Sequence, residues 1–206
     1  MNVKISYDTK FLAGICWDDN LLMNQYQISI DMLVNTADPV DQNVALLRIR
    51  HLLEEQLQNS YFVKKTDQDT IERLQLTGIK FSELPEQPID QIIGIILSAK
   101  FSAVTENRLL IKAVKISSLL GDNVTYIHDD DTEAFAGPTL WWNHAGSHVS
   151  DIVSTGSDNR DDLHVLRNTK RWKELGLHWS EDEDTCAESS NILIFNEHHD
   201  DTDNNK

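Results

Sequence analysis

The chain has 206 residues, of which 40% are apolar and 25% are charged, and this balance is typical of a globular protein with a core rather than a disordered chain. It carries 18 basic and 34 acidic residues, and residues 129–206 hold six of the basic and 18 of the acidic ones. The resulting net charge of −16 disfavours general nucleic-acid binding and attachment to anionic membranes, because it repels phosphate.

The first elements predicted along the chain are strands. Val3–Tyr7 and Tyr26–Met32 alternate apolar and polar residues, which predicts two strands with one wet face each. Between them, Phe11–Met23 predicts the end of a strand, a turn and a returning strand. A helix starts at Asp38-Pro39, because the aspartate side chain accepts hydrogen bonds from free amides of the first turn and proline needs no donor there. Its apolar stripe runs to about Asn59.

A shorter helix is predicted over residues 67–76. Thr66–Asp69 resembles a capping box in which Asp69 stands where Glu or Gln is usual, and Gly78 follows the last candidate turn. Residues 82–87 are predicted to form a loop.

The clearest patterns lie between Pro88 and Asp129. Apolar residues recur at spacings of three and four from Ile89 to Val104, which predicts an amphipathic helix with one wide buried face. Leu109–Leu119 and Val124–His128 are β-branched and apolar, and the glycine, aspartate and asparagine between them favour a tight turn. We therefore expect a core helix followed by a β-hairpin.

These elements predict an α+β core domain over residues 1–128, with a mainly antiparallel sheet covered by helices on one face in the order β-β-α-α-α-β-β. The order of two strands, helices and two strands is similar to that of the tunnelling fold of pterin- and purine-handling enzymes. The metal-binding histidine pattern of that superfamily is missing here. The resemblance therefore concerns topology alone and implies no function.

Residues 129–197 are predicted to form an acidic extension packed on the core, with one helix near 161–175 and a short edge strand at Ile192–Phe195. Residues 198–206 are expected to form a disordered tail.

Two cysteines, Cys16 and Cys186, are too few for a disulfide scaffold or a cysteine-based zinc site. The apolar neighbours of Cys16 predict a buried, inert thiol. We expect no secretory leader and no membrane span, since no window reaches the roughly 18 apolar residues that a span needs. A reduced, cytoplasmic location is the simplest expectation.

Two groups of residues are candidate binding sites. His144, His148 and Asp151 would offer two imidazoles and a carboxylate to a divalent metal if the segment were helical, although Gly146 and Ser147 weaken a helix there. Trp141 and Trp142 are adjacent, so in an extended segment one of them would lie at a surface, available to a ligand or partner.

A basic and aromatic run contains Arg167, Arg171 and Trp172. It favours either phosphate or RNA contact or, more simply, cations that complement the dipole of a helix end.

The uneven charge favours a non-enzymatic interaction protein whose acidic extension binds a basic protein partner, with no cofactor. The alternative is a small-ligand or metal-dependent enzyme with its pocket between the core sheet and the extension. A weaker alternative is RNA binding through residues 167–173. The sequence leaves enzymatic activity and homo-oligomerisation open.

Overall fold

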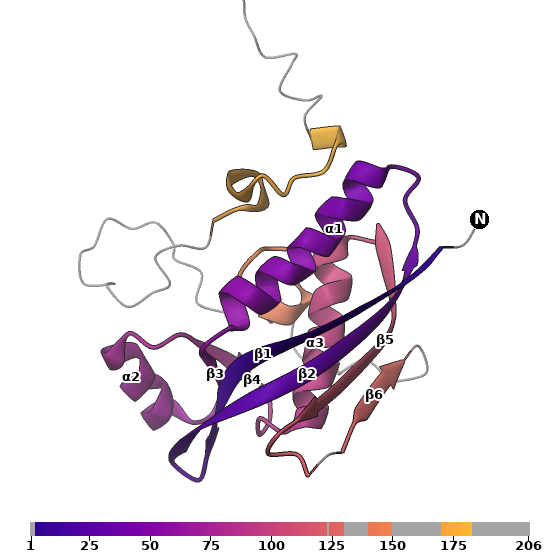
Figure 1. Ribbon diagram of the computed structural model, residues 1–206. Helices are drawn as coiled ribbons and strands as arrows, with labels where there is room; N and C mark the ends of the chain where they lie inside the picture. The colour runs from indigo at the N-terminus through magenta and orange to yellow at the C-terminus, as the bar shows by residue number, and fades with distance from the viewer. Residues whose placement is uncertain (1–2, 123, 130–139, 150–169, 183–206) are drawn as a thin grey trace, which may run out of the picture.

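A computed structural model describes residues 3–122, 124–129, 140–149 and 170–182 (Figure 1). Its centre is a six-stranded sheet in the order β4-β3-β1-β2-β5-β6. The strands are β1 Lys4–Trp17, β2 Asn20–Val34, β3 Ser60–Lys64, β4 Phe81–Leu84, β5 Leu109–Ser118 and β6 Tyr126–Asp129. The helices are α1 Pro39–His51, α2 Gln68–Thr77 and α3 Asp90–Thr105, with a π-helical turn at Leu52–Leu57 and 3-10 turns at Trp141–Asn143 and Trp172–Leu175.

The two faces of the sheet differ because side chains alternate along each strand. One face is apolar and packs beneath α1 and α3, which lie side by side on it (Figure 1). Its central residues are Phe11, Ala13, Ile15, Tyr26, Ile28, Ile30, Val114 and Ile116. On the opposite face, α2 covers only one end, where Ile71 and Leu74 pack with Cys16 and Val63. The rest of that outer face is not covered by a helix of the described chain.

The α+β prediction is confirmed, and most predicted elements lie within a few residues of the observed ones. The first two strands are longer than expected and meet at a tight turn, where Asp18 and Asp19 have positive φ angles of 46° and 62°. The helix predicted over 67–76 is α2, and the core helix and hairpin are α3, β5 and β6. Asp38 caps α1 as expected, accepting a hydrogen bond from the amide of Val40 at 2.8 Å.

Two short strands were not predicted, and they make the sheet mixed. β3 and β4 run parallel to β1 and to each other, and α2 forms the connection between them. Strands of five and four residues carry almost no alternation, so no strand was predicted over residues 60–64, and the loop predicted over residues 82–87 overlaps β4. The crossover also puts α2 on the face opposite α1 and α3.

The described parts of the C-terminal extension belong to the same core as the sheet. Trp141, Trp142, Val149 and Trp179 are buried in the cluster that α1 and α3 form with the strands. The helix predicted near 161–175 falls largely outside the described residues, and within them only Trp172–Leu175 forms a 3-10 turn. The predicted edge strand at Ile192–Phe195 and the tail also lie outside them. Among the described helices, none has the length and apolarity to cross a bilayer.

Candidate functional site

Four polar side chains meet on the helix-covered face, at the point where α3 begins. Asp90 is the first residue of α3 and Ser118 is the last of β5, while Tyr26 lies directly opposite Ser118 in the β2–β5 ladder. Asn24 precedes Tyr26 by two residues and so shares its face. The hydroxyl of Ser118 donates to Asp90 Oδ1 at 2.9 Å. We call Asn24, Tyr26, Asp90 and Ser118 the Asp90 site.

The Asp90 site is buried but incompletely hydrogen-bonded. Its four side chains are between 0 and 8% exposed, yet Asp90 Oδ2 and the hydroxyl of Tyr26 have no hydrogen-bond partner. The hydroxyl faces Asn24, whose Oδ1 already accepts from the backbone amides of Gln25 and Leu120. A buried polar group without a partner costs about 1–3 kcal/mol, so each such group in a folded protein calls for an explanation.

A loop between β5 and β6 lies directly on the carboxyl group of Asp90. A β carbon placed on Gly121 would lie 2.4 Å from Asp90 Oδ2, so any larger residue at this position would displace the carboxyl group. The neighbouring Leu119 and Leu120 are 75% and 52% exposed, which is unusual for leucines beside a core. Access to the carboxyl from solvent therefore depends on the position of this loop.

Burial shifts the titration of both acids of the site in the same direction. Burial raises the pKa of Asp90, and the hydrogen bonds from the hydroxyl and backbone of Ser118 only partly oppose this rise. Burial also raises the pKa of Tyr26; the side chain of Asn24 partly opposes this rise, and the nearby charge of Asp90 adds to it. Both groups therefore hold their protons more firmly than in water, as proton donors in enzyme sites do.

Two further buried polar atoms flank the site. His128 Nε2 has no partner and lies against α3 one turn beyond Asp90, where a β carbon on Gly94 would come within 2.6 Å of it. Burial lowers the pKa of His128, which favours the neutral imidazole. On the other side, Ser82 Oγ is also without a partner, and Ser82 pairs with Phe62, whose ring contacts Tyr26 edge-on.

The second half of α3 carries a buried lysine that is fully hydrogen-bonded. Lys100 is 0% exposed, and its ammonium donates to the carbonyl oxygens of Trp141, His144 and Gly146 at 3.0, 2.8 and 2.8 Å. Burial lowers the pKa of Lys100 to about 7. Since all three donors are used and no part of the side chain reaches solvent, Lys100 anchors residues 140–149 to α3 and has no role as a nucleophile.

A buried arginine anchors the second described part of the extension. The guanidinium of Arg48 lies 3.6 Å from the ring centre of Trp179 and 4.9 Å from that of Trp172. It also donates to the carbonyl oxygens of Leu177 and Val104 and pairs with Glu106 at 2.7 Å. These contacts hold residues 170–182 against α1 and the end of α3.

Among the described residues that the sequence predicted as site residues, Trp141 and Trp142 contact each other, with their rings edge-on. Trp141 and Trp142 are 0% and 2% exposed, because the 3-10 turn directs both indoles into the core. The expectation that one of them lies at a surface is therefore wrong. Trp172 stacks on Arg48 and Arg171 is exposed, while Arg167 lies outside the described residues.

The predicted metal ligands remain a prediction. His144 is exposed and His148 is half-buried, while Asp151 lies outside the described residues. In the part of the chain that is described, no three histidine, cysteine, aspartate or glutamate side chains are grouped to hold a metal ion.

The residues of the Asp90 site were missed, although the sequence holds a signal for two of them. Asn24 and Tyr26 occupy core-facing positions of a strand whose other inward residues are apolar, and a polar residue at such a position indicates a buried contact. No local pattern in the sequence indicates Asp90 or Ser118 as a site residue. Their contact depends on where α3 begins relative to the end of β5. Lys100 interrupts the apolar stripe of α3 in the same way as Tyr26 interrupts β2.

Comparisons with known proteins give distant structural likenesses only. No family model and no curated protein matches the sequence. An uncharacterized protein, WS1659, from Wolinella succinogenes is similar with a TM-score of 0.46 at 11% identity, over 64% of this chain and 99% of that one. The 6-pyruvoyltetrahydropterin synthase of Plasmodium vivax, as a catalytic-residue mutant, gives 0.42 at 10%, over 62% and 97%. The Plasmodium falciparum enzyme gives 0.41 at 13%, over 62% and 96%.

The main functional prediction, a non-enzymatic acidic interaction protein, is contradicted, because the similar solved chains include those of an enzyme. The structure also weakens its premise within the described residues. Glu181 of the extension already pairs with Arg108 of the core, and Glu174 accepts from the backbone amide of Arg171. At identities this low no residue role is transferred from the neighbours, and function has to be argued from the site itself.

Proposed function

We propose that this protein is a small-molecule enzyme that binds a polar group at the Asp90 site and transfers a proton to or from it. The proposal keeps the class of the alternative drawn from the sequence, a small-ligand enzyme, and changes its location. The site lies between the sheet and the start of α3 instead of between the sheet and the C-terminal extension, and it uses none of the residues predicted earlier.

The observation that carries the proposal is the pair of partnerless atoms, Asp90 Oδ2 and the Tyr26 hydroxyl, within one buried group of side chains. A fold that only needed stability would gain by having phenylalanine at position 26. A cluster of titratable groups that lowers the stability of the fold is typical of a site selected for binding or catalysis.

The geometry assigns each group a role. Asp90 exchanges the proton through Oδ2, since Oδ1 is held by Ser118. Ser118 positions the carboxyl, and the hydroxyl of Tyr26 hydrogen-bonds the polar group of the ligand. Burial raises the pKa of the Asp90 carboxyl, and this direction suits a group that acts as a general acid.

Tyr26→Phe tests whether the hydroxyl is kept for function. We expect the variant to be more stable than the native protein by about 1 kcal/mol in urea unfolding, since it removes a buried hydroxyl that has no partner. Tyr126→Phe is the matched control, because Tyr126 is a half-buried tyrosine on the same face of the sheet. A loss of stability in Tyr26→Phe would show a structural hydroxyl, satisfied through water, and would remove the main support for the proposal.

A second experiment tests binding directly. Acetamidinium carries two N–H donors that fit a carboxylate, so titration of the protein with it, followed by NMR, should shift the amide signals of residues 118–121. The shifts should be lost in Asp90→Asn. Equal shifts in the native protein and in Asp90→Asn would contradict a binding role for this carboxyl.

A further inference from the structure

The Asp90 site lies at one end of the molecule, where apolar side chains are exposed. The turn between β1 and β2, the end of β5 and the start of α3 all lie at this end, the lower one in Figure 1. Four of the large apolar residues found here are between 40 and 52% exposed, namely Trp17, Leu22, Ile89 and Leu120. We call these four residues the apolar rim. Exposed apolar residues that gather around one place mark interaction sites, whereas single ones are common anywhere.

Three members of the apolar rim are direct neighbours of residues of the Asp90 site. Leu22 lies two residues before Asn24 in β2, so both side chains are on the same face of the sheet. The backbone amide of Leu120 donates to Asn24 Oδ1 at 3.2 Å, and Leu120 precedes the glycine that lies over Asp90 Oδ2. Ile89 directly precedes Asp90. A ligand whose polar group reaches Asp90 therefore has the apolar rim beside it.

Trp17 lengthens the apolar rim along the β1–β2 hairpin. It follows Ile15 by two residues and so lies on the same face, and Ile15 is the direct partner of Leu22 in the ladder. Trp17 is therefore diagonal to Leu22, at a separation that long side chains bridge. Leu119 does not belong to the rim, because it lines a small hollow of the outer face together with Lys10. The rim is thus on the side of the sheet that also holds Asp90.

The charged residues around the apolar rim have an acidic excess. Besides Asp90, three aspartates belong to the two turns that flank the rim, namely Asp18, Asp19 and Asp122. Two cations at this end are balanced in ion pairs, Lys64 with Glu86 and Lys65 with Glu83. Two others remain, since Arg73 donates to a backbone carbonyl of the β1–β2 turn and Lys10 lies on the outer face. Four aspartates against these two cations favour a ligand that carries positive charge.

The two partnerless atoms of the Asp90 site fit an amine. A carboxyl group and an amine share one proton, which gives either a carboxylate with an ammonium or a neutral acid with a neutral amine, and a hydrogen bond joins them in both states. An amine therefore matches the proton exchange that the proposed function assigns to Asp90. The hydroxyl of Tyr26, the other atom without a partner, accepts a second N–H of the amine.

We propose that the Asp90 site takes an amphipathic primary amine, whose nitrogen lies at Asp90 Oδ2 and whose aliphatic chain lies along Leu120, Leu22 and Trp17. This inference rests on the proposed function and names the class of its ligand. The apolar rim selects such an amine over a short one such as methylammonium. The acidic excess selects it over an alcohol or a carboxylate with the same chain.

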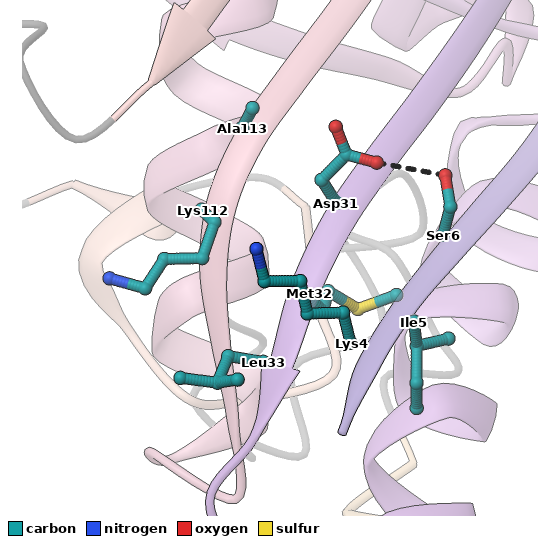
Figure 2. Close-up of a pocket in the computed structure, with 8 residues that line it drawn as sticks. All are labelled: Lys4, Ile5, Ser6, Asp31, Met32, Leu33, Lys112 and Ala113. Carbon is teal, nitrogen blue, oxygen red and sulfur yellow. Dashed lines mark hydrogen bonds between the residues drawn. The ribbon is translucent and has the colours of Figure 1, made fainter. Parts of the chain in front are cut away.

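A second carboxylate beside a hollow, that of Asp31, provides the contrast. Asp31 lines a hollow of about 640 Å³ on the outer face of the sheet. There it accepts hydrogen bonds from Ser6, as Figure 2 shows, and from Lys115, each at 2.8 Å. Each of its oxygen atoms therefore has a partner within the protein, so Asp31→Asn is the matched control for Asp90→Asn.

The test titrates the full chain with hexylammonium and follows the NMR signals of the backbone amides of residues 118–121. We expect hexylammonium to bind at least about tenfold more tightly than methylammonium, as the burial of two or more methylene groups gives. Hexanol and hexanoate at the same concentration should leave these signals unchanged. Leu22→Ser/Leu120→Ser should reduce the affinity for hexylammonium to that for methylammonium, and Asp90→Asn should abolish the shifts with both amines.

The control variants change residues outside the apolar rim. Leu12→Ser and Leu76→Ser replace exposed leucines of the outer face and of α2, and Asp31→Asn replaces the satisfied carboxylate. All three should bind hexylammonium as the native chain does. Equal affinity for the two amines, binding of hexanol as tight as that of hexylammonium, or equal weakening in the rim variant and the leucine controls would each overturn the proposal.

The same titrations separate this inference from the proposed function. If hexylammonium binds no more tightly than methylammonium, but both cause shifts that Asp90→Asn abolishes, the class of ligand is wrong and the binding role of Asp90 stands. If neither amine nor acetamidinium causes such shifts, the proposed function fails as well. A native chain that sediments as a dimer and becomes a monomer in Leu22→Ser/Leu120→Ser would also overturn the proposal, because a second copy would then cover the rim.

Discussion

The two ends of α3 bury polar groups in opposite ways. In its second half, Lys100 donates to three backbone carbonyl oxygens, and nearby Arg48 donates to two more and to Glu106. At its first turn, Asp90 leaves one carboxyl oxygen without a partner and lies beside a tyrosine hydroxyl in the same condition. Both regions are removed from water, so burial alone does not distinguish them.

This difference in hydrogen bonding distinguishes buried polar groups that stabilise the fold from buried polar groups that lower its stability. Lys100 and Arg48 tie residues 140–149 and 170–182 to the helices through bonds that are complete, and such bonds repay part of the cost of burying a cation. The Asp90 site joins α3 to β5 through the bond from Ser118 to Asp90, but it leaves two buried polar atoms without a partner. Substitutions should therefore destabilise one region and stabilise the other.

The largest effect is expected for Lys100→Met. Methionine fills a similar volume but leaves three buried carbonyl oxygens without a donor, so we expect a loss of about 4 kcal/mol in urea unfolding followed by tryptophan fluorescence. The amides of residues 140–149 should also exchange with deuterium faster. Lys10→Met, at an exposed lysine on β1, serves as the control and should leave stability unchanged. A Lys100 variant as stable as the native protein would mean that the three bonds contribute nothing net.

Arg48→Met should follow, with a loss of about 3 kcal/mol. It removes two bonds to carbonyl oxygens and the contacts with Trp172 and Trp179, but its carboxylate partner Glu106 is 36% exposed and can return to water. Hydrogen exchange should rise within residues 170–182 and stay unchanged in β1 and β2. Arg50→Met removes a neighbouring exposed arginine and should change neither. Faster exchange throughout the sheet would show that Arg48 supports the whole core instead of one segment.

The sequence predicts most of this scaffold because its long elements bury one face and so leave a periodic pattern. The hairpin of β5 and β6 and the cap at Asp38 depend on residues close together in the chain, and they are found where expected, whereas α2 is capped by Asp67 and not by Thr66 of the predicted capping box. β3 and β4 are too short to show a period, and their pairing with β1 is set by the crossover through α2.

The candidate site could not be predicted in the same way. Asp90 meets Ser118 across 28 residues, and Lys100 meets the carbonyl of Gly146 across 46. Such contacts depend on the relative placement of a helix, a strand and a loop, which local patterns do not encode. The prediction that Trp141 or Trp142 lies at the surface was wrong for a related reason. It assumed an extended segment, whereas the 3-10 turn at Trp141 lets both indoles face the core.

Asp90→Asn should increase the free energy of unfolding, whereas Lys100→Met and Arg48→Met should decrease it, and the change should be smaller. Because burial raises the pKa of Asp90, its contribution to stability is greatest below the ordinary value of 3.8 and is lost as pH rises through the folded-state pKa. The native protein should therefore lose stability relative to Asp90→Asn as the pH increases from about 4 to 7, with the variant ahead by about 1 kcal/mol at neutral pH.

Asp31→Asn, on the outer face of the sheet, should show the opposite dependence of stability on pH. Hydrogen bonds from Lys115 and then Ser6 lower the pKa of Asp31, so its contribution is present above pH 3.8 and is lost as pH falls through the lowered value. Urea unfolding of the native protein, Asp90→Asn and Asp31→Asn between about pH 2 and pH 7 measures both slopes. Slopes of the same sign for Asp90 and Asp31 would end the distinction between a satisfied and an unsatisfied carboxylate.

The smallest effect is expected at Asp67, a satisfied polar group near the surface that sets the scale for the others. Its Oδ1 accepts a hydrogen bond from the amide of Thr70 at 3.2 Å and so caps α2. Asp67→Ala should cost about 0.5–1 kcal/mol, while Asp67→Asn should be close to neutral because asparagine caps equally well. If Asp67→Ala proved as costly as Lys100→Met, hydrogen bonding in the buried anchors would contribute no more than a surface cap, and the contrast between the two ends of α3 would have to rest on Asp90 alone.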